Sequence, residues 1–473
     1  MKKAVVISVL YSLAAALVAA AGVLLCASVA RQKGLDSPAG WNMILMMPEN
    51  AAVAVAAIFI LLDAACVLLA VMMIRSAVRL GKEEKAKKKT QEKARFPRLS
   101  AFDSEAKKGC AKAGAGGISE KPEAARITEK PGAADNESAV DLASFTDGFR
   151  GFAAGNLGLY YEPDVIRTYV AAMAACRLTI LQGISGTGKT SLPYAFGKYT
   201  GNPAVIVPVQ PSWKDRTDLL GYYNEFTDTY TETELLFRLY TADSDGRVCT
   251  VVLDEMNIAR VEYYFAEFLS LLELPDASSR RVRVTADSRP SDPERFSGGT
   301  MPLSDNVWFS GTANNDDSTL AISDKVYDRA FVIELNSRAR PFPAEPRVQC
   351  PMTAKTLSGL FEKAFADHPV SERLMSGAEA LDRYLAARLG ITFGNRAFTQ
   401  FRKFVPAFVA AGGTETAAAD IMICRKILRK LDNLDPAVVK REAPGIRREL
   451  DAAFGAGSMP ECASFLDRRT GGE

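Results

Sequence analysis

Apolar and polar residues are distributed in three different ways along this chain. Residues 4–30 carry no charge and residues 51–74 carry only Asp63, so each run exceeds the ~20 residues that a helix needs to cross a bilayer. Residues 99–140 are rich in Ala, Gly, Lys, Glu, Ser and Pro and almost lack aromatic side chains, which is typical of a flexible segment. The pattern predicts a membrane anchor of two transmembrane helices over residues 1–80, a basic flexible linker over 81–143, and a globular part from 144.

The charges around the second apolar run predict its orientation. Residues 75–98 contain ten Lys and Arg against three Glu, whereas the loop 31–50 contains only Arg31 and Lys33 as basic residues. Positive charge is retained on the cytoplasmic side, so we expect a multi-pass membrane protein with its C-terminal part in the cytoplasm. Two alternatives stay open: each apolar run could be a buried core helix, and the first could be a signal peptide that ends near Ala30.

Beyond residue 145, short apolar runs alternate with helix-compatible stretches. Strands are predicted at 178–181, 204–209, 248–253 and 306–310, and helices at 160–176 and 191–199. Such alternation is typical of an α/β fold in which helices cover both faces of a parallel sheet. We expect that fold here, followed by a helical region from about residue 353.

The sequence GISGTGKT at residues 183–190 directly follows the first of these strands. Glycines allow backbone N–H groups to face a phosphate, Lys189 can reach the β and γ oxygens, and Thr190 offers its hydroxyl to Mg²⁺. The motif predicts binding of ATP or GTP with Mg²⁺. The residues expected to contact the nucleotide are Gly183, Ser185, Gly186, Thr187, Gly188, Lys189, Thr190 and Ser191.

Acidic and amide side chains follow two later strands. Asp254 and Glu255 end the run 248–253, and the carboxyl ends of parallel strands meet at one edge of a sheet. We expect Asp254 to hold Mg²⁺ together with Thr190, and Glu255 to activate the attacking water; a solvated turn is the alternative. Asn314, and after it Asp317, follow the strand 306–310 and are candidates to contact the γ-phosphate and that water.

Composition excludes several other kinds of site. The 473-residue chain has one histidine, His368, and no C-x-x-C pair among its eight cysteines, which excludes histidine metal clusters and a Ser-His-Asp triad. The net charge is +2, and much of the positive charge lies beside the apolar runs. No broad nucleic-acid-binding surface is therefore expected.

Four motifs together resemble the AAA+ ATPases, in the branch that contains the McrB-type motor subunits and the dynein-related and MoxR-like ATPases. They are GISGTGKT, VVLDEMNIARVEYYFAEFLSLLE, NVWFSGTANNDDSTLAISDKVYDRAF and GITFGNRAFTQFRKFV. The resemblance covers residues 160–431. It implies an AAA+ P-loop core over 144–350, a helical lid and C-terminal tail over 351–473, and a homo-oligomeric ring, typically a hexamer.

The resemblance also implies roles for three residues. Asn314 corresponds to the first sensor, Arg329 to the arginine finger that enters a neighbouring subunit's site, and Arg396 to the second sensor, which contacts the nucleotide from the lid. From the residues alone, Arg329 could instead pair with Asp324 or Asp328 nearby, and Arg396 could be an exposed lid residue.

The function expected from the sequence is a membrane-anchored nucleoside triphosphatase that remodels an unidentified partner protein or complex on the cytoplasmic side. Two alternatives remain. One is the motor subunit of a McrBC-like restriction or defence system, with its effector on another chain. The other is a nucleotide-switched membrane scaffold that turns over slowly. The complete set of catalytic positions favours an enzyme.

Overall fold

The computed structural model describes residues 71–72, 75–76, 79, 94–113, 140–244, 246–314 and 319–471. The chain divides into two units, residues 1–94 and 95–473, and the description below concerns the second. The predicted transmembrane helices at 4–30 and 51–74 lie outside the described residues, except for 71–72. Within the described part of the chain, no helix has the length and apolar character needed to span a bilayer.

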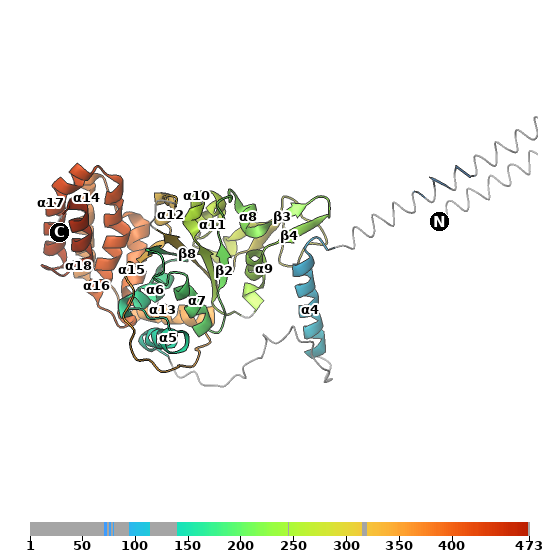
Figure 1. Ribbon diagram of the computed structural model, residues 1–473, viewed down its shortest axis with the longest axis horizontal. Helices are drawn as coiled ribbons and strands as arrows, with labels where there is room; N and C mark the ends of the chain where they lie inside the picture. The colour runs from blue at the N-terminus through green and yellow to red at the C-terminus, as the bar shows by residue number, and fades with distance from the viewer. Residues whose placement is uncertain are drawn as a thin grey trace, which may run out of the picture. The chain divides into compact units, whose positions relative to one another are not determined.

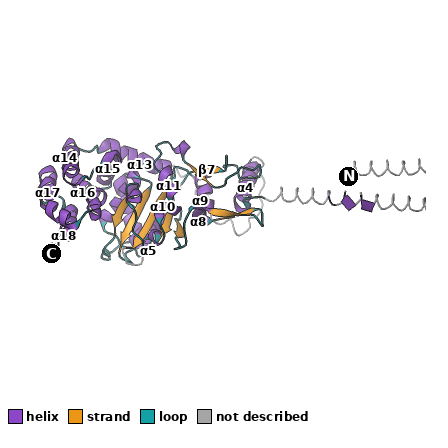
Figure 2. Cartoon of the chain, turned by 90° about the horizontal axis from the view of Figure 1, so that it is seen from above, coloured by secondary structure: helices purple, strands orange, loops and turns teal. Residues whose placement is uncertain are grey.

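A five-stranded parallel sheet forms the centre of the second unit, as the sequence predicts (Figure 2). The strand order is β2-β5-β8-β1-β9. The predicted strands are all present, and β9 is an additional strand that the sequence analysis did not identify. The strands are β1 (Leu178–Gly183), β2 (Val205–Pro208), β5 (Cys249–Asp254), β8 (Val307–Asn314) and β9 (Phe331–Glu334).

Side chains of the central strands alternate between two hydrophobic cores, because successive residues of a strand point to opposite faces of the sheet. Leu178 and Ile180 of β1 pack in one core, and Leu181 packs in the other. Both faces of the sheet are therefore covered, which explains why β5 and β8 are buried over almost their whole length.

The core that contains Leu181 is shared with helices on either side of β1 in the sequence and with the helices after the sheet (Figure 1). The earlier helices are α5 (Leu142–Leu157), α6 (Pro163–Ala175) and α7 (Ser191–Tyr199). The later ones are α13 (Ala354–Asp367), α14 (Glu372–Leu389), α15 (Gly394–Ala410), α16 (Glu415–Met422), α17 (Pro436–Phe454) and α18 (Pro460–Thr470). A π-helix, η5 (Ile423–Ile427), and a 3₁₀ helix, η6 (Leu428–Asn433), connect α16 to α17. The helical C-terminal region thus packs directly on the sheet.

The second core lies under shorter elements and two β-hairpins. The hairpins are formed by β3 (Gly221–Asn224) with β4 (Thr229–Glu232), and by β6 (Arg281–Arg283) with β7 (Thr300–Pro302). The helices are α8 (Arg216–Leu220), α9 (Glu234–Thr241), η2 (Ala242–Ser244), η3 (Met256–Ile258), α10 (Val261–Tyr264), α11 (Ala266–Leu271), η4 (Ala277–Ser279) and α12 (Asp324–Tyr327).

Part of the predicted flexible linker belongs to this second core, so the expectation for residues 81–143 is wrong over 95–113. Helix α4 (Pro97–Ala113) forms there, and Phe96 and Leu99 are fully buried. The composition of the whole segment concealed these few anchoring side chains. Residues 81–93 and 114–139 lie outside the described residues.

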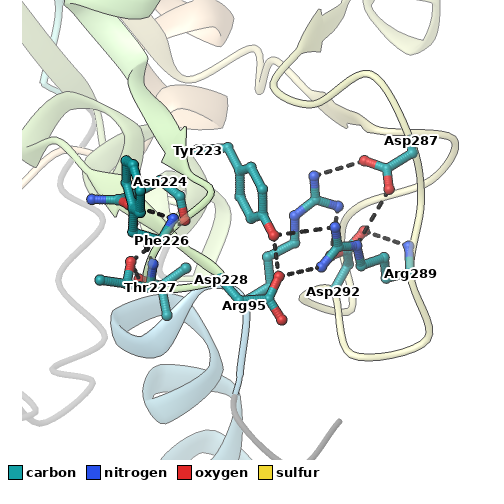
Figure 3. Close-up of polar contacts among 10 residues, drawn as sticks. Arg95, Tyr223, Asn224, Phe226, Thr227, Asp228, Asp287, Arg289 and Asp292 are labelled. Carbon is teal, nitrogen blue, oxygen red and sulfur yellow. Dashed lines mark hydrogen bonds and ion pairs between the residues drawn. The ribbon is translucent and has the colours of Figure 1, made fainter. Parts of the chain in front are cut away.

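Polar contacts attach the start of α4 to both hairpins (Figure 3). Arg95 is 4% exposed and pairs with Asp287, at 2.7 Å, in the β6–β7 connection. Arg289 of the same connection donates to Asp228 (2.9 Å) and to Tyr223 (3.2 Å) of the β3–β4 hairpin. The Tyr230 amide of β4 donates to the Arg95 carbonyl (2.7 Å), so the segment that follows residue 94 is anchored to the two hairpins.

Candidate functional site

The predicted phosphate loop lies between the end of β1 and the start of α7. Its glycines adopt positive φ angles of 149° at Gly183, 77° at Gly186 and 90° at Gly188, which side chains with a Cβ rarely adopt. A Cβ on Gly183 would also lie 2.3 Å from the carbonyl oxygen of Leu335, just after β9. The glycines of the motif thus meet a local backbone requirement, and Ser191 begins α7 as expected.

Lys189 is buried within this loop. Its ammonium donates hydrogen bonds to the carbonyl oxygens of Gly183 (3.0 Å) and Ile184 (2.7 Å). The buried charge is therefore solvated by the loop itself. The Lys189 side chain lies over the loop whose N–H groups would hold the phosphates.

Two side chains that the sequence analysis did not identify also contact the loop. The hydroxyl of Tyr161, just before α6, donates to the Gly188 carbonyl (3.0 Å), and Nε of Arg338, just after β9, donates to the Gly186 carbonyl (3.0 Å). Burial raises the pKa of Tyr161, so this hydroxyl stays protonated and remains a donor. Neither residue belongs to a motif, and only the fold brings them to the loop.

Asp254 lies at the carboxyl edge of the sheet beside the loop, as predicted. Its Oδ1 accepts hydrogen bonds from Thr190 (2.7 Å) and from Thr312 of β8 (2.8 Å). A hydroxyl and a carboxylate are ligands that Mg²⁺ favours, and this cation usually binds one or two protein oxygens plus phosphates and water. The described residues contain no cluster of three or more His, Cys, Asp or Glu that could hold a metal.

Glu255, the residue after Asp254, has a left-handed backbone, with φ 53° and ψ 46°. This conformation costs a non-glycine residue about 1–2 kcal/mol. The Glu255 amide donates to Thr312 Oγ1 (2.8 Å), which helps to maintain it. The carboxylate is exposed and has no hydrogen-bond partner among the described residues.

Asn314 ends β8 and pairs in register with Gly183, the first residue of the loop. Asn257 supports its backbone: the side-chain amide of Asn257 donates to the Asn314 carbonyl (2.9 Å), and the Asn314 amide donates to Asn257 Oδ1 (3.4 Å). Asn314 is thus beside both the phosphate loop and the Asp254 strand, as expected. The other candidate, Asp317, lies outside the described residues.

Arg329 lies at the opposite edge of the sheet, between α12 and the first residue of β9. Its Nε pairs with Glu273 Oε1 (2.5 Å), and its Nη1 donates to the Lys325 carbonyl (2.7 Å). Its acidic partner is therefore Glu273, which follows α11, and not Asp324 or Asp328. Sequence spacing pointed only to the two nearer carboxylates.

Arg396, near the start of α15, pairs with the same Glu273 oxygen (2.7 Å). Arg329 and Arg396 both line a cavity of about 430 Å³ at the amino edge of the sheet. Arg396 therefore lies beside Arg329, and β1 spans roughly 17 Å between this edge and the phosphate loop at about 3.3 Å per residue; its contact with a nucleotide stays a prediction. The packing of α15 against α6 places Arg396 beside Arg329.

No family model matches this chain, and no curated protein matches its sequence. Among solved structures, a "putative ATPase" from Cytophaga hutchinsonii is similar at 13% identity, with a TM-score of 0.44 over 64% of this chain and 92% of that one. A full-length MCM homologue from Methanopyrus kandleri is similar at 13% identity, with a TM-score of 0.36 over 60% of each chain.

Proposed function

We propose that this protein is an AAA+ nucleoside triphosphatase that hydrolyses ATP or GTP. The observation that carries the proposal is the contact between the two sequence motifs, in which Thr190 of the phosphate loop donates a hydrogen bond to Asp254 at the end of β5. The two oxygens that would hold Mg²⁺ are therefore together at the carboxyl edge of the sheet. Lys189 and Glu255 lie in the same two segments. Lys189 would contact the phosphates, and Glu255 would contact the attacking water.

The expected chemistry is in-line attack of water on the γ-phosphate. Thr190 and Asp254 would hold Mg²⁺, whose positive charge would offset the negative charge of the phosphates. Lys189 would stabilise the β and γ oxygens, and the exposed carboxylate of Glu255 would accept the proton of the attacking water. Asn314 would orient that water from the adjacent strand.

The position of Arg329 and Arg396 supports action between subunits. Both guanidinium groups lie at the amino edge, so neither can reach the phosphate loop of its own chain across the sheet. An anion brought by a second copy could meet them there. We therefore propose a homo-oligomeric ring in which both arginines of one subunit face the nucleotide of the next and stabilise the charge of its transition state.

A membrane location is a further part of the proposal and rests on the sequence. The two apolar runs at 4–30 and 51–74 would anchor the protein, and the basic residues after them would keep the ATPase on the cytoplasmic side. Its task there would be to remodel a partner protein or complex. A topology reporter fused after Glu473 should be active only as a cytoplasmic marker, and a signal from the other side of the membrane would overturn this orientation.

Two substitutions in the full-length protein test the enzymatic proposal. Lys189→Ala removes the cation that faces the phosphates and should weaken nucleotide binding at least about 100-fold. Glu255→Gln should preserve binding and retain the triphosphate, while turnover falls by about 10²–10⁴-fold, the usual contribution of a general base. Nucleotide titration and phosphate release measure the two effects separately. Wild-type turnover in the Glu255→Gln variant would show that this residue is not the base.

A further inference from the structure

Lys426, in the π-helix η5, holds the turn that carries Arg329. Its side chain is buried, and its ammonium donates three hydrogen bonds, to the carbonyl oxygens of Tyr327 (2.7 Å), Asp328 (2.8 Å) and Ala330 (2.6 Å). Two of these carbonyls belong to the residues on either side of Arg329. A buried ammonium is disfavoured unless its protons are bonded, and here the backbone of one turn satisfies all three.

Neighbouring residues of the same C-terminal segment strengthen this contact. The guanidinium of Arg429 stacks on the Tyr327 ring, 3.4 Å from its centroid. The Asn433 side-chain amide donates to Asp324 Oδ2 (2.7 Å) in α12. Helix α12 and the turn after it are thus fixed by side chains that follow Arg329 by about a hundred positions in the sequence.

The segment also contacts the other end of β9. Arg425 pairs with Glu334 (2.6 Å), the last residue of that strand. The next residue, Leu335, donates its amide to the Gln182 carbonyl (2.8 Å) beside the phosphate loop. Residues 425 and 426 therefore contact both ends of the strand that has the phosphate loop at one end and Arg329 at the other. A π-helix is rare and often marks a functional position.

We propose that Lys426 is a positioning residue for Arg329: it fixes the turn 327–330 so that the guanidinium faces the nucleotide of the neighbouring subunit. This role rests on the proposed function, because it requires Arg329 to act between subunits. The C-terminal helical region would in this way determine whether a subunit offers its arginine to the next. A purely structural lysine would instead stabilise the fold without a specific effect on that site.

Lys426→Met in the full-length protein tests the proposal. The variant should bind nucleotide within twofold of wild type and should lose about 10–100-fold in turnover, since displacement of a catalytic group by about 1 Å can cost 10²-fold. Lys440→Met is the matched control, because Lys440 is exposed on α17, and it should retain full activity. If Lys426→Met does not fold, Lys426→Gln, which keeps two donors, is subject to the same criteria.

Mixed rings separate positioning from a general structural defect. A Lys426→Met subunit retains its own phosphate loop and Glu255, whereas a Glu255→Gln subunit retains a well-positioned Arg329, so a mixture of the two should recover turnover. A mixture of Lys426→Met with Arg329→Ala should not recover, because both subunits then lack a competent arginine. Equal recovery in the two mixtures, or no recovery in either although mixed rings form, would overturn the proposal.

Comparison with Arg329→Ala separates failure of the role of Lys426 from failure of the role of Arg329. If Arg329→Ala lowers turnover and Lys426→Met leaves it within threefold of wild type, the role of Lys426 is wrong and the role of Arg329 stands. If Arg329→Ala retains full turnover, the proposed action between subunits is wrong, and the positioning role is overturned with it. A parallel fall in nucleotide affinity for Lys426→Met would identify a structural residue instead.

Discussion

The two edges of the parallel sheet both gather charged side chains, but they balance those charges differently. At the carboxyl edge, the Lys189 ammonium is bonded to carbonyls of its own loop, and Asp254 accepts hydrogen bonds from two threonines. At the amino edge, Arg329 and Arg396 share the single carboxylate of Glu273. The cavity there is lined by five basic residues, Arg177, Arg280, Arg329, Arg396 and Lys403, and by two acidic ones, Glu273 and Glu362.

This difference indicates how a site could be divided between two copies of the chain. The carboxyl edge forms a phosphate site from the consecutive residues of one loop and from the ends of β5 and β8, so a single subunit can build it. The amino edge has an excess of guanidinium groups over carboxylates, and an anion from outside would balance that excess. We therefore expect nucleotide affinity to depend on the first edge and turnover to depend on both.

The strongest test of this division is Arg329→Ala. An arginine finger contributes about 10³–10⁵-fold to turnover, so we expect at least a 10³-fold loss, with the nucleotide dissociation constant within twofold of wild type. Phosphate release and nucleotide titration measure the two quantities. Wild-type turnover per subunit should also rise with protein concentration until rings are complete, while affinity should not. A variant with parallel losses of affinity and turnover would contradict the division.

A second test concerns the carboxyl edge alone. Thr312→Val removes the hydroxyl that donates to Asp254 and accepts from the Glu255 amide. Loss of the acceptor for this partly buried amide costs up to about 1–3 kcal/mol, so we expect a roughly 10–100-fold loss of turnover in complete rings. Thr250→Val is the matched control, because the Thr250 hydroxyl on β5 is buried without a hydrogen-bond partner in the described structure. Equal activity of the two variants would show that Thr312 does not organise the site.

The third test asks which edge Arg396 serves. Arg396→Ala should lower turnover about tenfold and leave the affinity of isolated subunits for nucleotide unchanged, because the side chain pairs with Glu273 beside Arg329. Arg402→Ala, an exposed arginine on the same helix, should have no effect. Titration of nucleotide at subunit concentrations too low for rings provides the measurement. Weaker nucleotide binding by isolated Arg396→Ala subunits would show that Arg396 contacts the nucleotide of its own chain.

The smallest expected effect concerns pH. Burial lowers the pKa of Lys426 to about 7, from an ordinary value of 10.5, so the ammonium that donates three hydrogen bonds to the turn is the form present below about pH 7. Between these values the unfolded chain binds one more proton than the folded chain, so stability should rise with pH above 7 and be lost as pH falls toward 7. The charged or titratable groups that face the ammonium are Cys176, Asp328, Arg396 and Arg429.

Chemical denaturation at pH 7 and pH 9 measures this contribution. Wild type should gain free energy of unfolding relative to Lys426→Met by at most about 1.4 kcal/mol per pH unit, the value for one proton. Using the difference between the two proteins removes the contribution of other titrating groups. An identical pH dependence would show that Lys426 keeps the same proton count in the folded and unfolded states over this range.

The sequence alone determined the parallel α/β core and the carboxyl-edge site, because both depend on short contiguous segments. Apolar runs predicted four of the five strands, and GISGTGKT and Asp254-Glu255 stand where those runs end. Since parallel strands end at a common edge, the contact between Thr190 and Asp254 could be expected from the sequence. The family resemblance likewise singled out Arg329 and Arg396.

Only the tertiary structure decided which residues those arginines meet. Glu273 lies 56 positions from Arg329 and 123 from Arg396 in the numbering of the chain, and no local pattern connects them. Lys426 reads in the sequence as one more basic residue of a C-terminal helix, although it bonds the turn around Arg329. Phe96 and Leu99 were likewise hidden within a segment of disordered composition. In each case the contact joins positions far apart in the sequence. Such a contact depends on how packed helices place side chains in space. Neither local periodicity nor composition encodes that placement.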